Sequence, residues 1–145
     1  MSDHQWSVTG VDHVGVAVPD LDEAIAFYER AFGMRCTTVE VNEEQGVREA
    51  MMASGDGTGA QIQLLAPLTA DGPIGRFLAK RGPGMQQIAY AVSDLDAAAD
   101  SLHERGIELL GKHRLGTGGC RVNFIHPRDS GGVLVELVER PRHDG

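Results

Sequence analysis

The chain has 145 residues, of which 13 are Lys or Arg and 21 are Asp or Glu, so its formal net charge is −8. This acidic balance argues against nucleic acid as a partner, because a negative surface repels the phosphate backbone. No run approaches the roughly 18 apolar residues of a membrane span, and the polar residues 1–9 contain no apolar signal core. We therefore expect a cytoplasmic globular protein. Cys36 and Cys120 are too few for a disulfide framework and are expected to be reduced.

The chain contains an internal repeat. Residues 11–24 have the pattern of a strand followed by the start of a helix, and residues 85–98 show the same pattern with six identical residues at an offset of 74. Several identities at one offset are not expected by chance, so two copies of one supersecondary unit are predicted. The same offset sets His13 against Gln87.

In the first copy, a strand over residues 11–18 leads to a helix that begins after the capping residue Asp20 and ends at Gly33. Apolar residues between these two positions recur at helical spacing, which indicates one buried helix face. Three apolar segments of strand length follow, at residues 34–41, 47–53 and 60–65.

A Gly- and Pro-rich connector, residues 67–84, separates the copies, and its apolar residues Ile74, Phe77 and Leu78 have the spacing of a short helix. In the second copy the helix begins after Asp94 and stops at Gly106. Its strand segments are residues 107–110, 121–125 and 133–138.

These elements predict an α+β fold. After a tail over residues 1–10, residues 11–145 form a single domain with two βαβββ modules at about 11–67 and 85–138. A four-stranded half with one helix would leave a sheet face bare, and two halves together can cover it.

Basic residues cluster in two short runs, Lys80-Arg81 and Lys112-His113-Arg114. An anionic ligand would need such a patch in a chain this acidic. Each run taken alone also fits an ordinary solvated surface.

Polar residues interrupt apolar strands at positions that correspond between the copies. Glu136 is the only polar residue in its strand, and Gln63, 73 positions earlier, breaks a shorter apolar run. A buried carboxylate needs a partner. Together with His13 and Gln87, these positions offer one imidazole, two amides and one carboxylate, a set that suits a divalent cation with mixed N and O ligands. Alternatively, the four side chains only satisfy one another by hydrogen bonds.

Glu49 is a further candidate, because it shares a strand face with the apolar Val47 and Met51. The other possibility is a strand end turned to solvent. Adding 74 to Glu49 gives Asn123, so we expect both residues near the metal, lining the substrate site.

The duplicated unit, with His, Gln and Glu on inward strands, resembles the vicinal oxygen chelate superfamily, to which glyoxalase I, extradiol dioxygenases and methylmalonyl-CoA epimerases belong. The resemblance covers about residues 11–138 and implies a barrel built from the two βαβββ repeats. Several stretches resemble the epimerases in particular, namely residues 11–17, 42–49, 61–67, 74–78, 82–84, 121–127 and 132–137.

The resemblance also implies roles for single residues. The family's metal-binding His, Gln and Glu match His13, Gln63 and Glu136. The family's second metal-binding His matches Gln87, and an amide in its place favours a harder ion among cobalt, manganese, magnesium and zinc. The acid/base candidates match Glu49 and Glu136, and Asn123 is expected to orient the substrate.

The implied activity is the interconversion of (R)- and (S)-methylmalonyl-CoA by metal-assisted transfer of the α-proton, in a homodimer that binds an acyl-CoA thioester. Two alternatives of the same fold remain. One is a glyoxalase-type isomerase, and the other is a metal-free protein that binds a small molecule.

Overall fold

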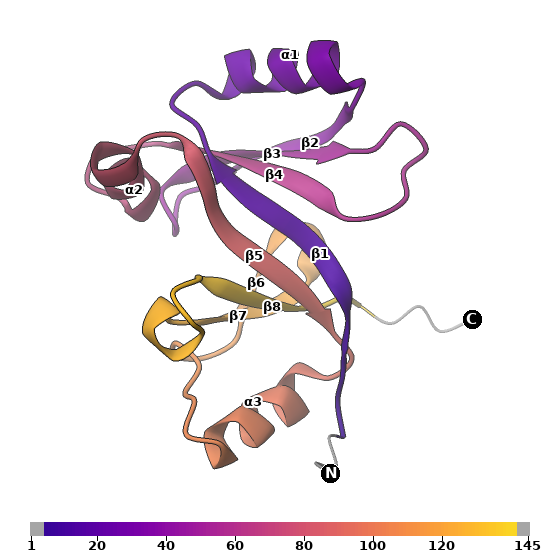
Figure 1. The fold of residues 1–145 in the computed structure, drawn as a ribbon, viewed down its shortest axis with the longest axis vertical. Helices are drawn as coiled ribbons and strands as arrows, with labels where there is room; N and C mark the ends of the chain where they lie inside the picture. Colours follow the sequence, from indigo (N-terminus) through magenta and orange to yellow (C-terminus); the bar gives the residue numbers. More distant parts are fainter. Residues whose placement is uncertain (1–4, 142–145) are drawn as a thin grey trace. The chain divides into compact units, whose positions relative to one another are not determined.

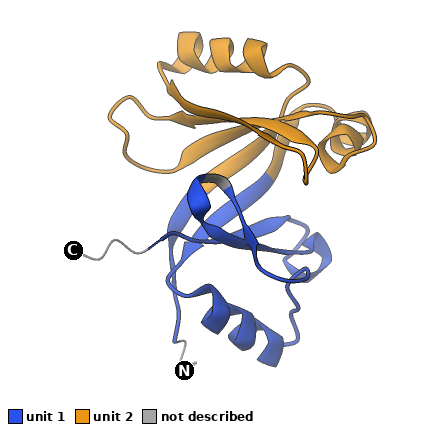
Figure 2. Ribbon diagram, turned by 180° about the vertical axis from the view of Figure 1, so that it is seen from behind, with its two compact units in different colours: residues 1–12, 87–145 blue, residues 13–86 orange. Residues whose placement is uncertain are grey.

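The computed structural model describes residues 5–141, apart from the side chain of Thr117. The chain divides into two compact units, residues 1–12 with 87–145 and residues 13–86 (Figure 2). Strand β1 (Val8–Ala17) contributes its first half to one unit and its second half to the other. Among the residues described, no helix is long and apolar enough to cross a membrane.

The unit of residues 13–86 contains a sheet with the strand order β2-β3-β4-β1, and helix α1 covers one face of it (Figure 1). Strand β1 is parallel to β4, whereas β3 is antiparallel to both of its neighbours. The elements are α1 (Leu21–Phe32), β2 (Arg35–Asn42), β3 (Val47–Ala53), β4 (Gln61–Pro67) and α2 (Pro73–Arg81).

The other unit repeats this arrangement with the strand order β5-β8-β7-β6 and helix α3 on one face. Strand β5 is parallel to β8, and β7 is antiparallel to both of its neighbours. The elements are β5 (Gly84–Val92), α3 (Leu95–Glu104), β6 (Arg114–Leu115), β7 (Arg121–Ile125) and β8 (Val135–Glu139), with short 3-10 turns at Thr117–Gly119 and Pro127–Asp129. The predicted βαβββ repeat is therefore confirmed.

The predicted starts of α1 and α3 and the predicted end of α1 are also confirmed, whereas α3 ends at Glu104 with Arg105 as its C-cap, and not at the predicted Gly106. Asp20 caps α1, because its Oδ1 accepts a hydrogen bond from the Glu23 backbone N–H at 3.0 Å, and Gly33 ends the helix with φ of 66°. Asp94 caps α3 in the same way, with its carboxylate 3.0 Å from the Ala97 nitrogen. Short polar side chains at this position satisfy backbone donors that the helix itself leaves unpaired.

One predicted strand is wrong. Residues 107–110 do not form a strand, and only Leu109 makes an isolated bridge, to Ile125. The second strand of this copy is instead the two-residue β6. Ile107 and Leu109 pack against the cluster under α3, so their apolar character reflects burial and not strand pairing.

Each sheet has a helix-covered face and an opposite face, and alternation along the strands sorts residues between the two. The buried cluster under α1 comprises Val18, Leu21, Ala50, Met52, Leu64 and Ala66. The cluster under α3 comprises Val92, Leu95, Ala98, Ile125, Val135 and Leu137. The predicted polar residues occupy the opposite faces, with the exception of Asn123. Both cysteines are free thiols, as expected.

Candidate active site

Five polar or charged residues are buried among the residues that the structure describes, and the sequence pattern singled out all of them. They are His13, Glu49, Gln63, Asn123 and Glu136. Gln87, the sixth predicted residue, is half-buried. Burying polar side chains costs free energy unless they find partners, so their contacts show how each is tolerated.

In the unit of residues 13–86, three of these residues share the face opposite α1. Gln63 lies beside Gly15 of β1, two residues after His13, so the His13 and Gln63 side chains point to the same side of the sheet. Glu49 lies two residues before the β3 partner of Gln63, again on that side. The Gln63 amide Nε2 donates a hydrogen bond to Glu49 Oε2 at 3.0 Å. The buried carboxylate is thus held by a buried amide.

The other unit contains an equivalent pair. Glu136 lies beside Ala89 of β5, two residues after Gln87, which is the same register as that of Gln63 beside Gly15. The Gln87 amide Nε2 donates to Glu136 Oε1 at 3.0 Å. Each repeat therefore presents one glutamine bonded to one glutamate, on the face away from its long helix.

The predicted correspondence between Glu49 and Asn123 is wrong by one residue. Glu49 pairs with Leu65, and the equivalent pair in the other unit is Val122 with Val138. A shift of one residue moves a side chain to the opposite face of a sheet. Asn123 therefore faces α3, away from Glu136.

Asn123 is fully buried, and its polar atoms bond within its own unit. Its amide nitrogen donates to the Gly111 carbonyl oxygen at 3.1 Å and lies 3.0 Å from His113 Nδ1, while its oxygen accepts from the Phe124 N–H at 2.8 Å. These contacts anchor the chain before β6 to strand β7. They do not support the predicted contact between Asn123 and a substrate.

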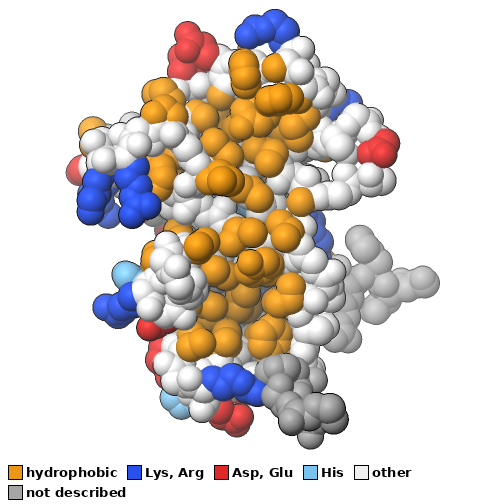
Figure 3. Space-filling model, viewed as in Figure 1, with side chains coloured by type: hydrophobic (Ala, Val, Ile, Leu, Met, Phe, Trp, Pro, Cys, Tyr) orange, Lys and Arg blue, Asp and Glu red, His pale blue; other side chains and the backbone are white. Residues whose placement is uncertain are grey.

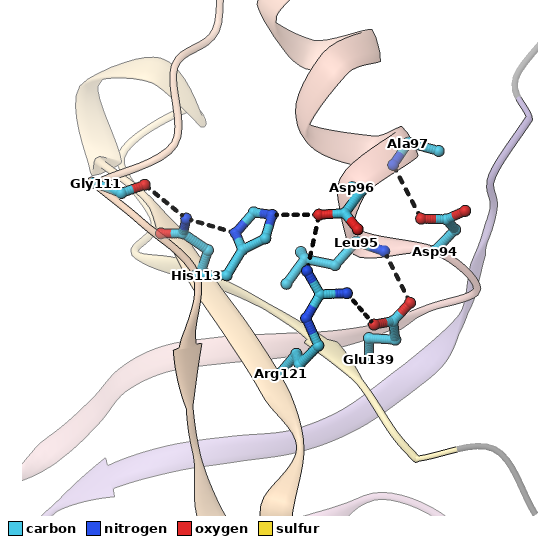
Figure 4. A network of polar contacts seen from close by, with 9 residues as sticks. Asp94, Leu95, Asp96, Ala97, Gly111, His113, Arg121 and Glu139 are labelled. Carbon is cyan, nitrogen blue, oxygen red and sulfur yellow. Dashed lines mark hydrogen bonds and ion pairs between the residues drawn. The ribbon is translucent and has the colours of Figure 1, made fainter.

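Asn123 begins a polar network that sequence reasoning missed (Figure 4). His113 Nε2 lies 3.2 Å from Asp96 Oδ1, and Arg121 bonds Asp96 and Glu139 at 2.8 Å each. The hydrogen bond from Arg121 is the main reason why the pKa of Asp96 is below its usual value. The residues that contact one another in this network are 10 to 25 positions apart in the sequence, so no regular spacing indicates the network.

A second missed contact lies next to His13. The Asp12 carboxylate accepts a hydrogen bond from Arg140 Nε at 2.7 Å, and only 6% of the Asp12 side chain is exposed. This bond raises the pKa of Arg140 above its usual value. The two residues are 128 positions apart, and the contact ties the chain immediately before His13 to the segment that follows β8.

The buried thiol of Cys120, on the Glu136 side of its sheet, is a poor candidate for chemistry. Cys120 packs with Val122, Phe124 and Val138, and its burial raises the pKa of the thiol above its usual value. A protonated, apolar thiol is neither a base nor a metal ligand. Cys120 is thus excluded from the acid/base and metal-binding candidates on this face.

The donor chemistry of the predicted ligands fits a divalent cation. Imidazole, carboxylate and amide oxygen are all ligands for magnesium, manganese or related ions. Within residues 5–141 there is no group of three or more His, Cys, Asp or Glu placed to hold a metal. Two of the four predicted ligands are glutamines, which are not among these four residue types.

Comparison with known proteins places the chain in a family. Residues 12–124 match the model of the Glyoxalase/Bleomycin resistance protein/Dioxygenase superfamily. A methylmalonyl-CoA epimerase structure from Mycobacterium tuberculosis is 53% identical with a TM-score of 0.88, over 93% of this chain and 90% of that one.

Two other relatives are also methylmalonyl-CoA epimerases. A variant of the Streptomyces coelicolor methylmalonyl-CoA epimerase, solved with 2-nitronate-propionyl-CoA, is 42% identical with a TM-score of 0.87, over 96% and 99% of the two chains. The human mitochondrial methylmalonyl-CoA epimerase is 37% identical, over 92% of this chain and 76% of its own length. The chain therefore belongs to the methylmalonyl-CoA epimerase family of the glyoxalase superfamily.

Proposed function

We propose that this chain interconverts (R)- and (S)-methylmalonyl-CoA by moving the proton on the carbon between the carboxylate and the thioester. The observation that carries the proposal is the Glu49 carboxylate, which is only 5% exposed and is held by the Gln63 amide. A carboxylate withdrawn from water and oriented by a hydrogen bond is suited to accept a proton from carbon. Membership of the epimerase family supports this reading.

Glu49 takes up or returns the proton on one face of the α-carbon. Inversion needs a second acid on the opposite face, and Glu136 is the candidate for that role. A carboxylate that also binds a cation is a weaker base, so Glu49 is the stronger candidate of the two. General acid–base catalysis of this kind is typically worth about 10² to 10⁴ in rate.

The residues proposed to hold a divalent cation are His13, Gln63, Gln87 and Glu136. A bound cation supplies polarisation of the thioester carbonyl and stabilises the negative charge that develops when the α-proton leaves. The hydrogen bonds support this assignment, because each glutamine holds its glutamate by Nε2, and its Oε1 is then the amide atom with metal-donor character.

Gln87 occupies the position at which the family usually has histidine. An amide oxygen is a weaker donor than imidazole for late transition metals, so the set of ligands favours manganese or magnesium over cobalt or zinc. The four ligands carry a single formal negative charge, and a divalent ion among them remains positive.

Exchange of the α-proton tests the proposal. One epimer of methylmalonyl-CoA is incubated with metal-supplemented protein in deuterated water, and the α-position is followed by NMR. We expect deuterium to enter that position while the other epimer appears. A wild-type protein that catalyses no exchange is not an epimerase.

The role of Glu49 is tested with a matched pair of variants. Glu40 lies opposite Glu49 on β2 and is exposed, so Glu40→Gln changes the same functional group on the neighbouring strand. We expect Glu49→Gln to lower kcat by about 10² or more, and Glu40→Gln to retain the wild-type rate. Full activity in Glu49→Gln would remove the proposed base.

Two further measurements separate the alternatives. Conversion of a hemithioacetal in place of an acyl-CoA would indicate a glyoxalase-type isomerase. Protein that is purified without chelator, contains no metal and binds its ligand without turnover would indicate a binding protein. Comparing methylmalonyl-CoA with its ethyl analogue then defines the range of malonyl thioesters that are accepted.

The resemblance to the epimerases also supports a homodimer, which we propose for this chain. Light scattering coupled to size-exclusion chromatography measures the mass directly. A mass of one chain at micromolar concentration would contradict the proposal, whereas twice that mass would support it.

A further inference from the structure

Helix α2 packs on the sheet face that carries the candidate base. Its buried residue Ile74 lies in one apolar cluster with Val47 and Leu65. Leu65 is the cross-strand partner of Glu49 and follows Gln63 by two residues, so all three side chains point to the same side of the sheet. Helix α2 is thus separated from the buried carboxylate by little more than one side chain.

The backbone of α2 fixes this position. A Cβ atom added at Gly75 would lie 2.4 Å from the Ala70 carbonyl oxygen and 2.6 Å from that of Thr69. The first turn of the helix therefore touches the preceding loop directly, through a residue without a side chain. This contact between the backbone of α2 and the backbone of the preceding loop fixes the position of α2 next to the candidate base.

The outer side of α2 is cationic. Arg76, Lys80 and Arg81 are exposed, and Arg76 and Lys80 share one side of the helix because they are four residues apart. The Arg81 guanidinium lies 5.9 Å from the ring centroid of Phe77. Figure 3 shows the Lys and Arg side chains gathered at the position of this helix.

These three cations have no anionic partner within the described part of the chain. The ion pairs found there join other residues, such as Arg48 with Asp22 and Arg121 with Asp96. A cluster of three unpaired positive charges is unusual in a chain whose net charge is −8. It creates a local positive potential that attracts an anion.

The other basic run of the sequence, Lys112-His113-Arg114, is less available to bind an anion, because two of its three side chains already have partners. His113 is bonded to Asp96, while Arg114 donates to the Leu110 carbonyl oxygen and lies over the ring of Phe124. Only Lys112 in that run has no such contact among the described residues. The α2 cluster is therefore the better anion site of the two.

We propose that Arg76, Lys80 and Arg81 bind the phosphate groups of the CoA nucleotide. This inference rests on the proposed function, because a CoA thioester carries its phosphates at the end of a long pantetheine arm. With the acyl group at Glu49, the arm spans more than the diameter of about 10 Å of one helix and reaches the outer side of α2. Guanidinium and ammonium groups bind phosphate by charge-assisted hydrogen bonds.

The test compares two substrates in three proteins. Methylmalonyl-CoA carries the nucleotide phosphates, and methylmalonyl-pantetheine lacks them. The variants are the triple Arg76→Gln/Lys80→Gln/Arg81→Gln and the control Arg30→Gln. Arg30 matches Arg81, because it is exposed and lies 5.9 Å from the ring centroid of Phe27, but on α1 and the opposite sheet face.

We expect the triple variant to raise KM for methylmalonyl-CoA about tenfold, since each exposed charge contact is worth a factor of about two. Its kcat and its KM for methylmalonyl-pantetheine stay at wild-type values, as do all constants of Arg30→Gln. In the wild type, added KCl raises KM for the CoA substrate and leaves the pantetheine substrate unchanged.

The outcomes separate this inference from the proposed function. An unchanged KM in the triple variant, or an equal rise for both substrates, overturns the phosphate site and leaves the epimerase proposal intact. A wild-type protein that turns over neither substrate overturns the proposed function itself. The salt dependence of the wild type checks the site without relying on the folding of any variant.

Discussion

The Gln63 amide nitrogen lies 3.0 Å from the Glu49 carboxylate, and both side chains are buried on the sheet face away from α1. The same pairing recurs between Gln87 and Glu136 in the other repeat. A side-chain amide has one donating end and one accepting end, so a glutamine that holds a carboxylate directs its oxygen to the other side. Gln63 is therefore suited to orient the base and to serve a cation at the same time.

If Gln63 acts by orienting Glu49, the two residues are coupled energetically. We expect Gln63→Ala to lower kcat by about 10² in the wild type, but by much less in the Glu49→Gln background, where there is no base to orient. The measurement is a double-mutant cycle on kcat with saturating metal. A coupling energy of at least about 1 kcal/mol is expected, and strictly additive losses would show that Gln63 acts independently of Glu49.

The two repeats could be predicted from the sequence because helix caps and strand patterns, which depend on neighbouring residues, mark the same elements in both copies. Asp20 and Gly33 fix the ends of α1 by capping chemistry, and Glu136 stands out as a lone charge in an apolar strand. These signals involve neighbours in the chain. Strand β7 (Arg121–Ile125) also has the predicted bounds, because Val122, Phe124 and Ile125 are residue types that favour strands.

What the sequence could not predict depends on pairing between distant segments. The offset between the two repeats is 74 at His13 but 73 at Gln63. The strand pairing shows that the offset is already 73 at Glu49, whose counterpart is Val122, and nothing in the sequence near Glu49 indicates this. Strand β1 begins at Val8, three residues before the predicted start, and there the Thr9 hydroxyl donates a hydrogen bond to the Ala91 carbonyl oxygen 82 positions away. Register and long-range bonds of this kind leave no periodic trace in the chain.

The glutamine at position 87 predicts a measurable change in metal preference. Gln87→His replaces an amide oxygen with an imidazole nitrogen, a stronger ligand for late transition metals. We expect the variant to bind Co²⁺ or Zn²⁺ at least about tenfold more tightly, in keeping with the effect of a ligand or its close neighbour on affinity. Titration calorimetry of the metal-stripped protein measures this without any assay of activity.

Mn²⁺ provides the internal comparison for that experiment, since its affinity should change little between the two proteins. Equal Co²⁺ affinities for the wild type and Gln87→His would remove Gln87 from the proposed set of ligands. The bond from Gln87 to Glu136 would then have a purely structural role.

Asn123 is predicted to matter for stability and not for chemistry. Removing its amide in Asn123→Ala leaves the Gly111 carbonyl oxygen and the Phe124 N–H without their partner. Each buried group left unsatisfied costs about 1 to 3 kcal/mol of unfolding free energy. Urea unfolding should therefore show a clear loss of stability, while kcat of the folded fraction stays within about threefold of the wild type.

A loss of kcat in Asn123→Ala comparable to that of Glu49→Gln would contradict this assignment. It would mean that Asn123 reaches the substrate despite lying on the face that packs against α3. Measuring kcat well below the unfolding transition keeps the two effects separate.

The network around Asp96 predicts a dependence of stability on pH. The hydrogen bond from Arg121 lowers the pKa of Asp96 in the folded protein below its usual value of 3.8. A carboxyl group with a lower pKa in the folded state stabilises the fold at any pH above its unfolded pKa, and this contribution disappears as pH falls through the folded pKa. Because 68% of the Asp96 side chain is exposed, solvent screens the interaction and its contribution is below about 1 kcal/mol.

We therefore expect Asp96→Asn to be less stable than the wild type near neutral pH, and the difference between the two to shrink towards zero as pH falls below about 4. Asp100→Asn is the control, because Asp100 is exposed on the same helix and forms no ion pair among the described residues. Urea unfolding at a series of pH values gives the free energies for all three proteins. If the difference between Asp96→Asn and the wild type were constant across this range, or were reproduced by Asp100→Asn, the ion pair with Arg121 would not be the source of the stabilisation.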